Sequence, residues 1–365
     1  MTAPASPSPS APPPAPKADA PRRGPLGALS SLPRGGTATV ALLLLLIFVV
    51  IATQNPSFFE GPPLMGFGKK AAPLVILAVG QYLVIVSGEF DLSVGSLVGA
   101  QVVVAARLID GDEAMTWPVL GLMVVFGLVV GLVNGLVTTL LKVPSIITTL
   151  GTMLILFGAV RYWTGGAPTG ALSDAFRVPG RNGIENVPVL HQIPWALLIA
   201  AAVVVAGVLV MRSPYGRTLM ATGDNDTAAA FSGVRVWSVR TLAFMASSLL
   251  ATLAAVLIGG YAGVTAQVGQ GLEFTAITAV VLGGVVLGGG RGTVLAAALG
   301  ALTVEALFTL FNQLYLPSTI QPAAQGLIII AAVAYASRRG ELRLPGRPLR
   351  RPDHPTGHSP GSSRR

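Results

Sequence analysis

The chain has 365 residues, of which 52% are hydrophobic and only 11% are charged, and its net charge is +9. A soluble domain of this length needs roughly a quarter of its residues charged to cover its surface, so the composition favours a protein with a lipid-facing surface. The chain has no cysteine, which excludes disulfides, thiolate metal sites and cysteine nucleophiles, and its three histidines show no metal-ligand spacing.

The chain begins with a polar leader followed by an apolar run. Residues 1–36 are rich in Pro, Ala and Ser, bury too little apolar surface to offset the entropy of ordering, and are predicted to form a disordered cytoplasmic tail. Residues 37–54 are apolar and carry no charge. A leader of this length before a charge-free run favours an uncleaved membrane anchor over a signal peptide.

Ten apolar segments of near-membrane length are predicted to be helical spans. The fold class expected is therefore all-α, a single polytopic integral membrane domain over residues 37–336. Several of the segments are shorter than the ~20 residues that cross a bilayer as a straight helix. The two shortest are predicted to be partial or broken helices, and eight or nine spans remain an alternative. The spans are 37–54, 71–87, 94–108 (short), 117–141, 145–162, 194–211, 241–260, 275–288 (short), 293–312 and 320–336.

The distribution of basic residues favours one orientation of these spans. Residues 337–365 are predicted to be a second disordered, basic tail, and the two tails hold half of the 24 basic residues. With both termini inside, 18 basic residues lie on the cytoplasmic side and six outside, in agreement with the positive-inside rule. The prediction is a multi-pass protein of the plasma membrane with both termini cytoplasmic. Basic flanks beside hydrophobic spans indicate membrane lipid, and not nucleic acid, as their partner.

A polar break separates the second and third spans. Glu89 and Asp91 lie there, where unpaired charge is costly. In one interpretation Asp91 caps the helix that begins near Leu92, Ser93 assists, and Glu89 faces lipid headgroups. In the other, the break lies beside the substrate path, because non-helical backbone at membrane depth is tolerated where it lines a water-filled cavity.

Glycines and polar residues within the spans indicate where helices pack closely and where polar groups need a partner. Glycines at four-residue spacing indicate close helix–helix packing, and they are Gly95, Gly99, Gly127, Gly131 and Gly135. Asn134 shares the second glycine face and is a candidate for an interhelical hydrogen bond. Glu305 and Gln325 lie inside the last two spans and must face protein or a cavity. A role in the pathway, an interhelical hydrogen bond and a subunit contact all remain open for them.

Residues 212–235 form the only sizeable polar stretch that this topology places in the cytoplasm. Proline and glycine at positions 214–216 are expected to end the preceding span. A short helix is predicted over residues 226–231, with small side chains along one side.

The ends of this short helix are marked by residues that typically cap helices. Asp224 or Asn225 is expected to cap its beginning, and Gly233 its end. Phe231 would then stand as an apolar peg on the surface. Such a helix suits docking into a groove on a partner, and a solvated connector with an incidental helix is the alternative.

Four stretches resemble the permeases of monosaccharide ABC importers of the ribose, xylose and galactose type. They are similar to the family's Gly-x-x-Asp-Leu-Ser-Val-Gly-Ser signature, its Val-Pro-Ser run, its coupling-helix pattern and its late glycine-rich block. In this sequence they span 88–96, 143–151, 216–233 and 271–292, and the resemblance covers roughly residues 70–336. The family usually has an acidic pair before the alanines of the coupling helix and an arginine after them. Asp226-Thr227 and Ala230 stand here instead, which weakens any specific salt bridge to the ATPase and leaves the helix shape intact.

The resemblance implies a complex in which two permease copies, identical or different, form the pore. Two ABC ATPase subunits would dock below it, and an extracytoplasmic sugar-binding protein would deliver the solute. ATP would be used by the partner subunit, and this chain would bind no cofactor or metal and contain no catalytic residue. The sequence agrees in having no Gly-x-x-x-x-Gly-Lys-[Ser/Thr] loop to cradle a nucleotide.

Residues of two kinds are carried over from these motifs and from the polar positions in the spans. Those predicted to couple to the ATPase are Gly216, Arg217, Gly223, Asp224, Asn225, Asp226, Ala228, Ala229, Phe231, Ser232 and Gly233. Candidates for the translocation path are Glu89, Asp91, Ser93, Asn134, Thr148, Thr149, Glu273, Glu305 and Gln325.

Other classes of membrane protein fit the sequence less well. A secondary transporter driven by an ion gradient would need intramembrane carboxylates, of which Glu305 is the only one well inside a span. An ABC permease for branched-chain amino acids or another small polar solute belongs to a related group, but the Asp-Leu-Ser-Val-Gly-Ser wording favours the sugar branch. A membrane-embedded enzyme lacks support, because the sequence has no paired His, Cys or carboxylate constellation.

Overall fold

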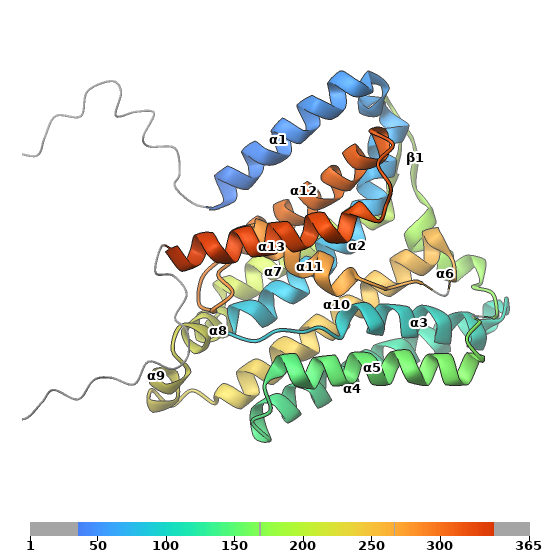
Figure 1. The fold of residues 1–365 in the computed structure, drawn as a ribbon. Helices are drawn as coiled ribbons and strands as arrows, with labels where there is room; N and C mark the ends of the chain where they lie inside the picture. The colour runs from blue at the N-terminus through green and yellow to red at the C-terminus, as the bar shows by residue number, and fades with distance from the viewer. Residues whose placement is uncertain (1–35, 168, 266, 339–365) are drawn as a thin grey trace, which may run out of the picture. The chain divides into compact units, whose positions relative to one another are not determined.

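The computed structural model describes residues 36–167, 169–265 and 267–338, and most of these residues are helical (Figure 1). Nearly all of the two predicted disordered tails lies outside the described residues. The helices are α1 (Gly36–Gln54), α2 (Gly61–Val86), α3 (Val94–Ile109), α4 (Thr116–Leu140), α5 (Ser145–Thr164), α6 (Asp174–Arg181), α7 (Trp195–Arg212), α8 (Pro214–Asp224), α9 (Asp226–Phe231), α10 (Val236–Ala262), α11 (Leu272–Leu282), α12 (Val294–Gln313) and α13 (Ile320–Arg338). Short 3-10 turns, η3 (Pro56–Phe59) and η4 (Glu113–Met115), and a hairpin of β1 (Gly183–Val187) and β2 (His191–Pro194) complete the set.

The ten predicted spans correspond to α1–α5, α7 and α10–α13, which confirms an all-α polytopic membrane protein. Among the described residues, seven of these helices are long and apolar enough to cross a membrane. The other three, α3, α11 and the described apolar part of α13, are shorter. The two segments predicted to be partial helices are indeed short, with 16 residues in α3 and 11 in α11. The helix α11 ends at Leu282 and not at 288, because Gly283 and Gly284 come next and Gly284 has a φ of +81°.

Two helices, α2 and α10, form the centre of the bundle. The helix α2 packs on α7, α10, α11 and α12, while α10 packs on α2, α3, α4 and α6. In the most apolar window of α2, 89% of residues are buried, compared with 17% in those of α1 and α7. The start of α2 at Gly61 lies ten residues before the predicted 71, since the Pro62-Pro63 pair occupies the first turn, where proline is compatible with a helix.

The outer helices present apolar side chains at the protein surface. Leu45 on α1, Leu154 on α5 and Val205 on α7 are all about 60% exposed (59%, 61% and 59%). Exposed apolar surfaces on three helices would be unfavourable in water, and they are the surfaces expected of helices that face the lipid chains of a membrane.

The predicted glycine face on α4 packs directly against α10. A Cβ added at Gly131 would lie 2.6 Å from Cα of Met245, and one added at Gly135 would lie 2.6 Å from Cα of Thr241. Because glycine has no Cβ, the backbones of α4 and α10 can approach this closely. The predicted close helix–helix packing is therefore confirmed at this face. The other two glycines, Gly95 and Gly99 on α3, pack on the irregular backbone just before α11, and Gly95 also contacts the Glu273 side chain in the first turn of α11.

The connection between α5 and α7 contains structure that the apolar pattern does not predict. The helix α6 begins at Asp174, is capped by the Ser173 hydroxyl, and packs on α10. The hairpin pairs Gly183 with Pro194 in antiparallel fashion. Elements of eight, five and four residues are too short to show a hydrophobic period, so tertiary contacts decide them.

Candidate translocation path and coupling surface

The helix α2 ends in a capping motif that turns the chain into the polar break. Gly88 has a φ of +91°, and its N–H donates to the carbonyl of Ile85 at 2.9 Å. The next N–H, that of Glu89, donates to the carbonyl of Val84 at 3.2 Å. This pair of bonds is a Schellman motif, in which glycine takes the left-handed position without steric cost. Residues 87–93 then run without helix to the start of α3 (Figure 1).

Asp91 lies at the centre of the break and is fully buried. One carboxylate oxygen accepts from the N–H and the hydroxyl of Ser93, at 3.0 and 2.6 Å. The other accepts from the hydroxyl of Ser247 on α10 at 3.2 Å. Asp91 and Ser93 thus form a turn before α3, and Ser93 stands at the N-cap position without a side-chain capping bond of its own.

Side chains from α4 and α5 complete this network. Asn134 donates from its amide to the Ser93 hydroxyl at 2.9 Å and accepts from the hydroxyl of Thr152 at 2.6 Å. The Thr149 hydroxyl accepts the N–H of Leu92 at 3.0 Å. The Ser145 hydroxyl likewise accepts from the N–H of Phe90 at 3.1 Å. Buried non-helical backbone needs such partners, and here Ser145 and Thr149 of α5 supply them.

Glu89 points away from this buried network and toward Arg240, the fifth residue of α10. Its carboxylate lies 3.2 Å from the guanidinium, and the Glu89 side chain is only 14% exposed. In one interpretation of the sequence Glu89 faces lipid headgroups, and the structure shows that its partner within the protein is Arg240 of α10. The sequence does not single out Arg240, since nothing local to residues 236–240 indicates a partner 151 residues earlier.

The remaining path candidates do not join the network. Thr148 precedes Thr149 on α5, and its buried hydroxyl oxygen has no partner among the described residues. Glu273 is 4% exposed in the first turn of α11, where its carboxylate lies over Gly95 of α3. Thr148 and Glu273 are polar like the residues of the break, but neither forms a hydrogen bond with them in the described structure.

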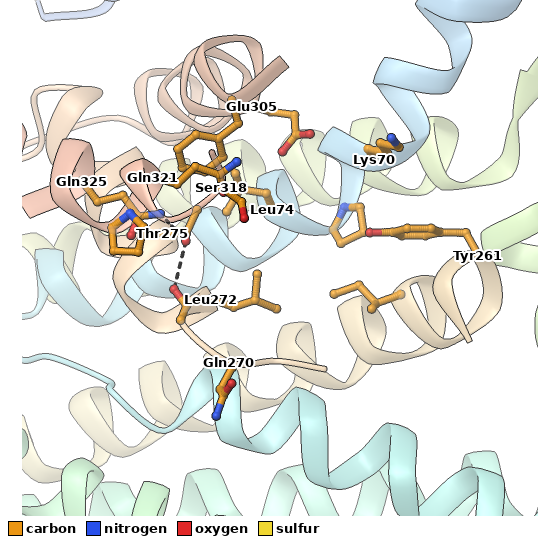
Figure 2. Close-up of a pocket in the computed structure, with 15 residues that line it drawn as sticks. Lys70, Leu74, Tyr261, Gln270, Leu272, Thr275, Glu305, Ser318, Gln321 and Gln325 are labelled. Carbon is orange, nitrogen blue, oxygen red and sulfur yellow. Dashed lines mark hydrogen bonds between the residues drawn. The ribbon is translucent and has the colours of Figure 1, made fainter. Parts of the chain in front are cut away.

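Glu305 and Gln325 share a separate cavity of about 380 Å³ between α2, α10, α11, α12 and α13. The amide of Gln325 donates to the hydroxyl of Thr275 at 2.8 Å. Lys70 and Tyr261 approach the cavity from α2 and α10 (Figure 2). Hydrogen-bonding side chains therefore gather here from helices far apart in sequence.

The polar stretch after α7 forms two helices and not one. The hydroxyl of Ser213 caps α8, and Pro214 occupies its first turn. The expectation that positions 214–216 end the preceding span is correct, since α7 ends at Arg212. A second helix that the sequence did not predict, α8, begins at Pro214 and extends to Asp224. Proline is compatible with the first turn of a new helix.

The predicted short helix is α9. Of its two candidate caps, Asn225 is the one used: its side-chain oxygen accepts the N–H of Ala228 at 2.9 Å. Gly233, with a φ of +87°, lies just beyond its end. Ala229 is buried, whereas Phe231 is 89% exposed. The exposed coupling candidates of α8 and α9 are Arg217, Asp224, Asn225, Asp226, Ala228, Phe231, Ser232 and Gly233, while Gly216 is buried and Gly223 half-buried.

Gly223, near the end of α8, contacts the end of α2. A Cβ at this position would strike the carbonyl oxygen of Val86 and lie 2.7 Å from the N–H nitrogen of Gly290. That N–H donates to the same Val86 carbonyl at 2.9 Å. The end of α2, the end of α8 and the turn between α11 and α12 therefore meet at one junction made of backbone.

Comparison with known proteins agrees with this architecture. Residues 65–333 match the family described as branched-chain amino acid transport system / permease component. The autoinducer 2 import system permease protein LsrC of Yersinia enterocolitica is 31% identical over 307 residues, covering 84% of this chain and 83% of that protein. Its counterparts in Yersinia pestis and Yersinia pseudotuberculosis are 32% identical, over 84% of this chain and 85% of theirs.

No solved structure matches the chain. The family match covers most of the sequence, and seven of the described helices suit a membrane span. The chain is therefore a multi-pass membrane protein, and it belongs to this family of transport-system permease components.

Proposed function

We propose that the chain is the translocation subunit of an ATP-driven importer, and that α9 is the surface on which a separate ATPase subunit acts. The observation that carries this proposal is the form of α9. It is a short, capped helix that exposes Phe231 (89%) and is joined through Asp226 to the break after α2. An exposed aromatic side chain on a rigid element is a typical anchor for a partner protein. ATP would be hydrolysed in that partner, and this chain would need no cofactor.

The proposed solute is a small hydroxylated molecule of the sugar class. The LsrC relatives are named as importers of autoinducer 2, and the Gly88–Ser96 stretch resembles the sugar branch of the family. The cavity supports the same class, because amides and hydroxyls line it, among them Gln270, Thr275, Gln321 and Gln325. Such groups satisfy the hydroxyls of a sugar, whereas a branched aliphatic side chain would leave them unpaired.

The proposed assembly contains a second permease copy and an extracytoplasmic solute-binding protein. In this arrangement α8, α9 and the turn between α11 and α12 face the cytoplasm, as the basic flanks indicate. ATP-driven closure of the ATPase subunits would move α9, and with it the segment that leads into α3. The pore would then alternate between outward- and inward-facing states.

The test is uptake of labelled monosaccharides into proteoliposomes of defined orientation that hold this chain, its binding protein and a co-expressed P-loop ATPase. We expect uptake that requires ATP and survives ionophores. Phe231→Ala should abolish co-purification of the ATPase and ATP-driven uptake, while Tyr315→Ala, a substitution of an equally exposed aromatic residue (94%), should change neither. Uptake that continues without the ATPase and collapses with an ion gradient would show a secondary transporter instead.

Topology provides an independent check. Because the chain has no cysteine, Asn225→Cys introduces a unique thiol. A membrane-impermeant thiol reagent should label it only after the cytoplasmic side is opened. Labelling from the outside of intact cells would contradict the proposed contact with a cytoplasmic ATPase.

A further inference from the structure

Arg240 connects the exposed helix α9 to the break between α2 and α3. One terminal nitrogen of its guanidinium lies 3.2 Å from the Glu89 carboxylate in the break. The other lies 3.4 Å from the Asp226 carboxylate in the first turn of α9. Its third nitrogen, Nε, donates to the carbonyl of Ser87 at 3.2 Å. All three nitrogens of this side chain are therefore engaged. They connect α10 to the break, through Ser87 and Glu89, and to α9, through Asp226.

The position of this arginine is unfavourable for the helix that carries it. Arg240 lies near the N-terminus of α10, where the helix dipole disfavours a cation. The same side chain lies at the C-terminus of α2, where the dipole favours one, and between two carboxylates. Its location is thus explained by α2, Glu89 and Asp226, and not by α10 itself.

The two ion pairs differ in their exposure to water. Glu89 and Arg240 are 14% and 17% exposed, whereas Asp226 is 51% exposed. Exposed pairs are weak and easily exchanged, while shielded ones are stronger and hold their geometry. The inner contact is therefore suited to remain when α9 moves, and the outer one to form and break.

The inner contact leads on to the hydrogen-bonded network of the break. Glu89 is two residues before Asp91, which binds Ser93 and Ser247. From Ser93 the bonds continue through Asn134 to Thr152 on α5. A displacement of Arg240 would therefore act on a segment whose polar groups are held by neighbouring helices.

We infer that Arg240 is a positioning residue that transmits movement of α9 to the break at residues 87–93. This inference rests on the proposed function and adds to it the residue through which the ATPase-facing helix acts on the membrane segment. A guanidinium suits this role best, because its planar fork reaches Glu89 and Asp226 at once, whereas a lysine ammonium is a single point charge. Arg240 does not line the cavity that holds Gln325.

The test measures directly how accessible the break is to a reagent in solution. Leu92→Cys is introduced into the cysteine-free chain within the full complex, and its rate of labelling by a soluble thiol reagent is measured with ADP and with ATP plus vanadate. We expect a clear difference between the two states with Arg240 present. In Arg240→Gln that difference should be lost while the ATPase subunit still binds and hydrolyses ATP. Solute moved per ATP should fall about tenfold, which corresponds to about 1.4 kcal/mol of coupling free energy.

Matched variants separate this role from general damage. Arg235→Gln removes an exposed arginine from the start of the same helix and should leave the labelling difference and the transport ratio unchanged. Arg240→Lys and Glu89→Gln should lie between the original chain and Arg240→Gln. If Arg240→Gln does not fold, Glu89→Gln carries the test alone.

Two results would overturn the inference. Arg240→Gln with normal transport per ATP and an intact labelling difference would show that α9 acts on the break by another route. A variant that loses ATPase binding altogether would show that Arg240 only shapes the docking surface. Failure of the proposed function would look different, because the complex with Arg240 intact would then show no ATP-dependent uptake at all.

Discussion

The amide of Asn134 on α4 donates a 2.9 Å hydrogen bond to the hydroxyl of Ser93, which stands directly before α3. The same side chain accepts from Thr152 on α5 at 2.6 Å, and it is fully buried. One residue thus satisfies polar groups of two other spans at the point where the backbone is not helical. Side-chain hydrogen bonds thus hold the candidate path residues of the break in place, and their contribution to the free energy of unfolding can be measured.

Asn134→Leu removes both bonds and leaves two hydroxyls without this partner. We expect a loss of about 1–2 kcal/mol in the free energy of unfolding, the usual cost of an interhelical bond between buried polar groups. Thermal unfolding in detergent measures it. Asn312→Leu, at a position closer to the protein surface, should stay within about 0.5 kcal/mol of the original chain. Equal stability of the two variants would show that the network contributes nothing to stability.

Gly131→Ala tests the close approach of α4 to α10. The added Cβ would lie 2.6 Å from Cα of Met245, a backbone atom that cannot rotate away. We expect a destabilisation of about 1–3 kcal/mol from overpacking, measured by thermal unfolding. Gly121→Ala on the same helix has open space around the new Cβ and should be neutral, or stabilising by up to about 1 kcal/mol. The packing argument fails if the two alanines behave alike.

Asn225→Ala removes the cap of α9. The N–H of Ala228 then loses its 2.9 Å partner, and the first turn is expected to fray at a cost of about 1 kcal/mol. Amide hydrogen exchange over residues 226–231 should accelerate, and affinity for the ATPase should fall about fivefold. Asn225→Ser keeps a capping oxygen and should restore both. Unchanged exchange in the alanine variant would mean that packing alone holds α9.

Gln325→Leu tests the cavity as part of the solute path. It removes the amide that donates to Thr275 at 2.8 Å and makes the wall apolar. We expect the solute concentration for half-maximal uptake to rise about fivefold, the effect of one neutral hydrogen bond, with little change in ATPase binding. Gln267→Leu, at an exposed position outside the cavity, is the control. Identical uptake curves would remove this cavity from the path.

Much of the architecture was predictable from local pattern. Hydropathy marked ten apolar helices, seven of which are long enough among the described residues to cross a membrane, and it also marked α3 and α11 as short. Asn225 and Gly233 marked the ends of α9, since capping depends only on the nearest few residues. The extent of α8 and the α6–hairpin region were missed, because short amphipathic elements carry no clear period.

The arrangement of the candidate site depended on contacts between distant positions. The sequence alone determined which segments are apolar, where the chain must break and which polar residues lie at membrane depth. Only the tertiary structure decided that Glu89 meets Arg240, that Asp91 meets Ser247, and that Gln325 meets Thr275 in a cavity apart from both. Pairs separated by 50 to 156 residues leave no periodic trace in one sequence, because their partners are set by how the helices pack.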